Sequence, residues 1–112
     1  MKVEILYFPG CPNHIPAVDR VREVLQQEGT SADMVEVEVM DAVTAQHVGF
    51  LGSPSIRVDG QDVEPAARTI RVFGMMCRTY FDGGRRAGLP PPEWIRAAVR
   101  EARGRSCAST TN

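Results

Sequence analysis

The sequence has no long apolar run, few aromatic residues and too few cysteines for a disulfide framework. No stretch approaches the ~18 apolar residues of a membrane helix, and residues 1–5 lead directly into a strand pattern, so we expect a cytoplasmic protein that does not contact a membrane. No basic and aromatic stripe of the kind that stacks bases is present, so we expect no nucleic-acid partner. An odd count of three cysteines favours reactive or ligating thiols over structural disulfides.

The composition is that of an ordinary globular domain. Of 112 residues, 43% are hydrophobic and 24% are charged, which excludes disordered and fibrous classes. A chain of this length buries enough surface for one core without staples. We therefore expect one domain over residues 1–103 and a flexible C-terminal tail over residues 104–112, which is rich in Ser and Thr.

The net charge of −1 conceals two halves of opposite sign. Residues 1–67 carry four basic residues against eleven acidic ones, and residues 68–112 carry nine arginines against three acidic residues. Arginine suits planar carboxylate or phosphate partners. An anionic small thiol such as glutathione is the one candidate co-reactant. It would be held by Arg57, Arg78, Arg85 and Arg86, unless these residues are only surface charge. No other cofactor is expected.

Hydrophobic periodicity predicts the elements of the first half. A short, nearly continuous apolar run over residues 3–8 predicts a central strand, and alternation over residues 34–40 predicts an edge strand. Between them, helical spacing over residues 13–28 predicts a helix that begins close to Cys11 and has a buried stripe made of Ile15, Val18, Val21 and Leu25. A strand, a helix and a strand in this order form a parallel unit.

Turn chemistry predicts much of the second half. Residues 42–49 predict a short helix, and Asp59-Gly60 predicts a type I′ turn in a hairpin over residues 55–63. Residues 65–92 give only a short strand or loop around residues 77–81, followed by a surface turn. Proline at residues 90–92 opens a last helix, whose predicted buried stripe is Trp94, Ile95, Ala98, Val99 and Ala102.

Two motifs carry a resemblance to a known superfamily. The segments Tyr7-Phe8-Pro9-Gly10-Cys11-Pro12-Asn13-His14 and Phe50-Leu51-Gly52-Ser53-Pro54-Ser55-Ile56, with Val58-Asp59-Gly60, resemble the thioredoxin-like superfamily over about residues 2–103. More narrowly they are similar to a group of small single-cysteine thioredoxin-like proteins and selenoproteins, some labelled alkylmercury-lyase-like. The resemblance implies an α/β fold of order β-α-β-α-β-β-α, with a four-stranded mixed sheet flanked by helices.

The candidate catalytic residues are Cys11, His14 and Cys77. The free N–H groups at a helix start favour thiolate over thiol, so Cys11 is the predicted nucleophile unless it is a packed, inert cysteine. His14 stands where the superfamily has its resolving cysteine; it would tune the thiolate, protonate a leaving thiol, join a metal site or remain a solvated histidine. Cys77 is the candidate resolving thiol, or else a packed core thiol. Cys107 is expected to be incidental.

The resemblance also implies a substrate-binding set of Pro12, Ser53 and Pro54. In the superfamily the proline that matches Pro54 is cis, and the backbone of the residue before it pairs with an extended substrate. A trans proline that merely starts a strand is the alternative.

Three functions from different classes follow. The first is a thiol-disulfide oxidoreductase, monothiol or split-dithiol, acting on a protein or small-molecule disulfide. The second is a protein that binds mercury, another soft metal or an organomercurial through Cys11 and Cys77; it is weakly supported because a metal site usually needs four ligands. Met75 and Met76 would add soft thioethers but are expected to fill the core, and His47 is expected at the surface. The third is a non-catalytic interaction module. The oligomeric state stays open.

Overall fold

The computed structural model describes residues 1–110, with side chains through Arg105. Along the chain it has the following elements: β1 (Lys2–Tyr7), α1 (His14–Gln27), β2 (Asp33–Glu38), α2 (Ala42–Val48), β3 (Ser55–Val58), β4 (Gln61–Asp62), the 3-10 helix η1 (Pro65–Thr69), β5 (Tyr80–Asp82), β6 (Arg85–Ala87) and α3 (Pro92–Thr110).

Strands β1 to β4 form one mixed sheet in the order β2-β1-β3-β4. β1 is parallel to β2, with α1 between them in the chain, and antiparallel to β3. The prediction of a four-stranded mixed sheet with a central first strand and an edge second strand is confirmed. The β3–β4 turn has positive φ at Asp59 (49°) and Gly60 (81°), as a type I′ turn requires.

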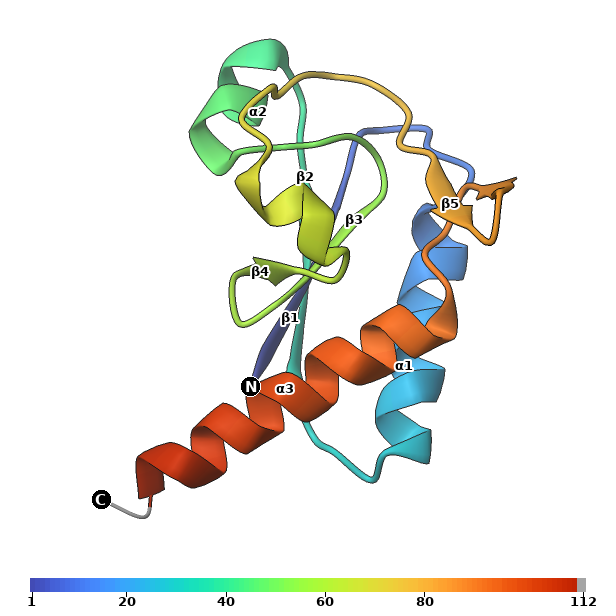
Figure 1. The fold of residues 1–112 in the computed structure, drawn as a ribbon. Coiled ribbons are helices and arrows are strands. Elements are labelled where there is room, and N and C mark those ends of the chain that lie inside the picture. Colours follow the sequence, from blue (N-terminus) through green and yellow to red (C-terminus); the bar gives the residue numbers. More distant parts are fainter. Residues whose placement is uncertain (111–112) are drawn as a thin grey trace.

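Helices cover both faces of the sheet. α1 and α3 pack side by side (Figure 1), and their apolar stripes meet Val3 and Ile5 of β1 in the larger core. A smaller core contains Leu6 of β1 together with Val39, Ala45 and Phe50, which come from α2 and its flanking loops. β1 is thus buried on both sides, and its C-terminal end opens into the loop that carries Cys11.

The buried stripe of α1 differs from the predicted one. Ile15 is 59% exposed, whereas Ala17 and Val24 join Val18, Val21 and Leu25 in the core. At about 100° per residue, Ile15 points about 120° away from the centre of that stripe. The helix begins at His14, so Ile15 belongs to an exposed first turn beside the Cys11 loop.

Between η1 and α3 the chain forms a second, two-stranded sheet. β5 and β6 pair antiparallel around Gly83 and Gly84, both of which have positive φ. The sequence predicted only a short strand or loop and a turn here, because three-residue strands leave too short a period to detect. Figure 1 places this hairpin beside the start of α1.

α3 is longer than predicted and continues past residue 103 to Thr110. Glycine inside a helix costs only ~1 kcal/mol relative to alanine, so Gly104 alone does not end it. The contact of Arg105 with Glu101, one turn earlier at 2.7 Å, supports the added turn. Within residues 1–110, no helix is long and apolar enough to cross a membrane.

Candidate thiol site

Cys11 lies in the turn between β1 and α1. Its N–H donates to the Phe8 carbonyl at 3.3 Å, and its own carbonyl accepts from the N–H of His14 at 3.3 Å. Gly10 has φ 82°, which allows the chain to reverse before the cysteine. Cys11 is half-buried and reduced, and it precedes the first helical residue by three positions. The thiol therefore stands close to the helix start but outside the helix.

The ring of His14 is held by the sheet. Its Nε2 hydrogen-bonds to a carboxylate oxygen of Glu36 on β2 at 2.5 Å, and the ring stacks on Tyr7 with 3.5 Å between centroids and 6° between planes. Within residues 1–105, no hydrogen bond joins this ring to the Cys11 sulfur. Burial, together with the charges of Glu38 and Glu36, raises the pKa of Tyr7. Neither Tyr7 nor Glu36 was a predicted site residue, because their contacts with His14 depend on the pairing of β1 with β2.

Ser53 ties the Cys11 loop to the start of β3. Its hydroxyl accepts a hydrogen bond from the N–H of Phe8 at 3.2 Å, and the Ser53–Pro54 peptide bond is cis, as expected. Both residues are buried. The antiparallel pairing of β1 with β3 ends at Leu6 and Ser55, and the hydrogen bond between Phe8 and Ser53 lies just beyond it.

The backbone of Ser53 is already paired on its other side. Its N–H donates to the Met76 carbonyl at 2.8 Å, and its carbonyl accepts from the N–H of Arg78 at 3.0 Å, which makes a parallel bridge with Cys77. Gly52 allows this approach, since a Cβ there would lie only 3.0 Å from Cβ of Arg78. The edge expected to pair with an extended substrate is occupied by residues 76–78 of the same chain.

This pairing brings both candidate thiols to one end of the sheet. Phe8, Ser53 and Cys77 lie side by side, so the Cys77 backbone is about two strand spacings, roughly 10 Å, from that of Phe8. Cys77 is exposed and reduced. It lines an apolar cavity of about 410 Å³ together with Leu51, Ile70 and Val72.

The two methionines before Cys77 do not fill the core. Met75 and Met76 are 39% and 40% exposed, so the expectation that they pack inside the protein is wrong. The main-chain bonds of residues 76 and 78 to Ser53 hold this segment against the sheet, and the side chains of Met75 and Met76 are left exposed. Two thioethers therefore stand exposed beside a thiol.

Arg78 anchors this segment through a buried ion cluster. Its guanidinium donates to both carboxylate oxygens of Asp62, at 2.6 and 2.8 Å, and to Glu64 at 3.0 Å, while it lies over the Tyr80 ring. Burial alone would lower the pKa of Arg78, but the hydrogen bonds to Asp62 and Glu64 outweigh it and raise the pKa. Burial raises the pKa of Tyr80, whose hydroxyl donates to the Pro54 carbonyl at 2.6 Å.

Of the arginines considered for an anionic thiol, Arg78 is paired with carboxylates and Arg57 is held by backbone carbonyls. Asp62 and Glu64 neutralise the charge of Arg78. Arg57 donates to the carbonyls of Val48 and Gly49 at the end of α2. Arg85 and Arg86 lie exposed on β6, where Arg86 rests over the Phe81 ring. The assignment of Arg78 to a small-molecule ligand is therefore withdrawn.

The structure gathers few metal donors. Among the described residues, no group of three or more His, Cys, Asp and Glu side chains could hold a metal ion. His47 is exposed on α2, as expected. The side chain of Cys107 lies outside the described part of the chain.

Pro12 is exposed next to Cys11, and the neighbouring Asn13 packs against Gly88. A Cβ atom at Gly88 would clash with the Asn13 amide, so the glycine lets the segment after β6 approach the Cys11 loop. Sequence periodicity carries no signal for this contact.

A scan against family models finds no match, and searches of curated proteins and of solved structures also find none.

Proposed function

We propose that the protein is a thioredoxin-like thiol-disulfide oxidoreductase in which Cys11 is the nucleophile and Cys77 the resolving thiol. The observation that carries the proposal is the double role of Ser53. Its hydroxyl holds the Cys11 loop, and its backbone holds the Cys77 segment. The mixed sheet, the helices on its two faces and the motifs around Cys11 and Pro54 support the same assignment.

The reaction consists of two exchanges. The Cys11 thiolate attacks a substrate disulfide; a Cys11–substrate disulfide forms, the substrate S–S bond breaks, and the leaving thiolate takes up a proton. Cys77, after losing its proton to water, then attacks the Cys11 sulfur and releases the second substrate thiol. The resulting Cys11–Cys77 disulfide is reduced by two equivalents of a small thiol such as glutathione, which leave as their own disulfide.

The occupied backbone of Ser53 favours a small disulfide as substrate. A polypeptide strand would have to displace residues 76–78, which are held by two main-chain hydrogen bonds and by the Arg78 cluster. A small disulfide needs only the exposed surface around Cys11 and Pro12. His14 is a positioning residue, because Glu36 and Tyr7 hold its ring and thereby fix the first turn of α1.

Capture of a soft metal is the second candidate, favoured by the exposed thioethers of Met75 and Met76 beside Cys77. Thioether and thiolate ligands select thiophilic ions. This function predicts uptake of one equivalent of Hg²⁺ without thiol turnover. The two functions therefore differ in a single measurement, the number of thiol exchanges per protein molecule.

The test is the glutathione-dependent reduction of hydroxyethyl disulfide, with Cys107→Ser as the matched control. We expect multiple turnovers that vanish in Cys11→Ser, persist in Cys107→Ser and fall at least about tenfold in Cys77→Ser, with a mixed disulfide on Cys11 detected by mass spectrometry. A Cys77→Ser variant at the full rate would remove Cys77 from the mechanism. Turnover retained in Cys11→Ser would overturn the proposal. Stoichiometric Hg²⁺ binding without turnover would favour the second candidate. A protein with neither turnover nor Hg²⁺ binding would fit a non-catalytic interaction module.

A further inference from the structure

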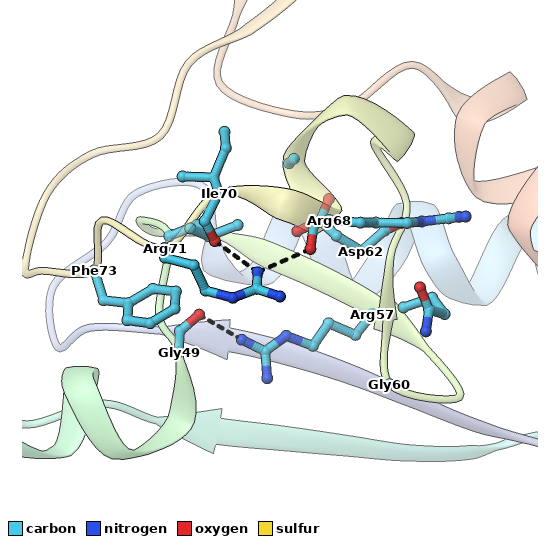
Figure 2. Close-up of a pocket in the computed structure, with 11 residues that line it drawn as sticks. Gly49, Arg57, Gly60, Asp62, Arg68, Ile70, Arg71 and Phe73 are labelled. Atoms are coloured by element: carbon cyan, nitrogen blue, oxygen red, sulfur yellow. Dashed lines mark hydrogen bonds between the residues drawn. The ribbon is translucent and has the colours of Figure 1, made fainter.

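A second cavity, about 300 Å³ in volume, lies on the face of the β3–β4 hairpin opposite to Ile56 and Val58 of the larger core (Figure 2). The end of α2, the hairpin and the loop after η1 enclose it. Three arginines line it, Arg57, Arg68 and Arg71, against a single carboxylate, that of Asp62. The balance of charge in this cavity decides what it can hold.

The one carboxylate does not neutralise these arginines. Both oxygens of Asp62 accept hydrogen bonds from Arg78, and one also accepts the N–H of Glu64 at 2.9 Å. Arg68 has Glu101 at 3.4 Å. Within residues 1–105, Arg57 and Arg71 have backbone carbonyls as their hydrogen-bond partners and no carboxylate. Two full positive charges therefore remain in the cavity.

Both guanidinium groups are held in place by the backbone. Nη2 of Arg57 donates to the Val48 and Gly49 carbonyls at 2.8 and 2.7 Å, and Nη1 of Arg71 donates to the Arg68 and Ile70 carbonyls at 3.0 and 3.1 Å. Each guanidinium has five N–H donors, so about three on each stay open. Figure 2 draws both arginines among the residues that line the cavity. Fixed, forked donors of this kind match the oxygens of a phosphate or carboxylate.

Apart from Gln61, the remaining side chains of the wall are apolar. Phe73, Leu51 and Ile70 line the cavity, and Gly49 presents bare backbone beneath the Phe73 ring (Figure 2). A Cβ on Gly49 would lie 3.4 Å from that ring and 3.6 Å from Nη2 of Arg57. The cavity is at the small end of the range for ligand pockets, about 300 to 1,000 Å³. Its walls therefore suit an oxyanion attached to a small flat apolar group.

We infer that this cavity is a binding site for a small organic oxyanion, whose phosphate or carboxylate pairs with Arg57 and Arg71 and whose apolar part packs on Phe73. The inference is independent of the thiol chemistry, since the cavity contains neither Cys11 nor Cys77. Arg57, which sequence analysis considered for an anionic thiol, thus acquires a ligand role together with a partner from the loop after η1.

The experiment is a ¹⁵N–¹H NMR titration of the whole protein at low salt with four probes: inorganic phosphate, phenyl phosphate, benzoate and neutral benzyl alcohol. We expect the amides of residues 49, 57 and 71–73 to shift with the three anions. Phenyl phosphate should bind at least about fivefold more tightly than inorganic phosphate, because the ring adds apolar contact. The two aryl anions distinguish a phosphate ligand from a carboxylate ligand.

Arg71→Met is the main variant, because its side chain is exposed and contacts only carbonyls. Arg57→Lys keeps the charge but loses the fork, and Arg22→Met on α1 removes a distant exposed charge as the matched control. We expect Arg71→Met to weaken phenyl phosphate binding at least about tenfold, Arg57→Lys to weaken it severalfold, and Arg22→Met to change it less than twofold. Equal losses in Arg71→Met and Arg22→Met, equal binding of benzyl alcohol, or no shift at these amides would overturn the inference. A dispersed spectrum of each variant verifies its fold.

Discussion

Two arginine groups lie close to Asp62 of β4, and they differ in what faces them. Arg78 is 8% exposed and is surrounded by Asp62, Glu64, Ser55 and the Tyr80 ring. Arg57 and Arg71 are more exposed and contact carbonyls. The first group has its charge matched by the protein, whereas the second holds charge for which the described residues supply no counterion. Arginine count alone, as read from sequence, does not separate structure from binding.

The largest expected effect is that of Arg78→Met on stability. Without the guanidinium, Asp62 is left as a buried carboxylate with no cation bonded to it, and breaking a buried pair in this way costs ~3–5 kcal/mol. Urea unfolding at pH 7 measures the loss. The double variant Arg78→Met, Asp62→Leu should recover part of it, because no buried charge is then left. A loss below ~1 kcal/mol would show that the pair behaves as a surface ion pair.

Tyr80→Phe tests the buried cluster around Arg78 with a smaller expected loss of stability. The variant keeps the ring under Arg78 but leaves the buried Pro54 carbonyl without its donor, for an expected loss of ~1–2 kcal/mol. Tyr7→Phe is the control, because the Tyr7 hydroxyl has no hydrogen-bond partner within residues 1–105 and its ring still stacks on His14. Equal losses in the two variants would mean that the Pro54 bond contributes nothing.

Local features of the fold could be predicted, and contacts between distant segments could not. The Asp59-Gly60 turn and the short α2 helix depend on neighbouring residues, and both were predicted. Ser53 and Cys77 are 24 positions apart, and their bridge depends on how the loop after η1 returns to the sheet. The opposite charges of the two halves of the sequence did indicate contacts between them. Arg78 and Arg100 of the second half pair with Asp62 and Glu28 of the first half.

In the candidate site, too, local features could be predicted and contacts between distant segments could not. Cys11 could be placed in the turn before a helix because Pro9-Gly10 ends a strand and the apolar periodicity starts just afterwards. The orientation of His14 toward Glu36 could not be predicted, because it needs the parallel register that sets β2 beside β1. The exposure of Met75 and Met76 likewise follows from the Ser53 pairing rather than from their apolar character.

Stability measurements on the second arginine group sharpen the comparison. Arg57→Met removes two hydrogen bonds to the end of α2, for an expected loss of ~1 kcal/mol, and Arg71→Met should change stability by less than ~0.5 kcal/mol. Both values come from the same urea experiment as Arg78→Met. A loss in either variant as large as that of Arg78→Met would make the cavity arginines structural and contradict the distinction drawn here.

The smallest expected effect concerns Glu28, where arginines of α3 contact a carboxylate at the end of α1. Hydrogen bonding from Arg100, with the charges of Arg100 and Arg103, lowers the pKa of Glu28. A carboxyl group whose pKa is lower in the folded state contributes stability above its unfolded pKa of ~4.3, and loses that contribution as the pH falls through its folded value. Wild type should therefore have a larger free energy of unfolding than Glu28→Gln at pH 7. The two values should converge below pH ~4.

The urea midpoints of wild type, Glu28→Gln and the exposed control Glu23→Gln, measured between pH 7 and pH 3, test this. Added salt should shrink the Glu28 difference, since Arg100 and Arg103 are exposed and exposed charges are screened at a Debye length of ~3 Å in 1 M salt. The Arg78→Met loss should persist in the same salt, because the pair it breaks is buried. If salt instead removed both differences, burial would not be what distinguishes the Asp62–Arg78 pair from the surface arginines.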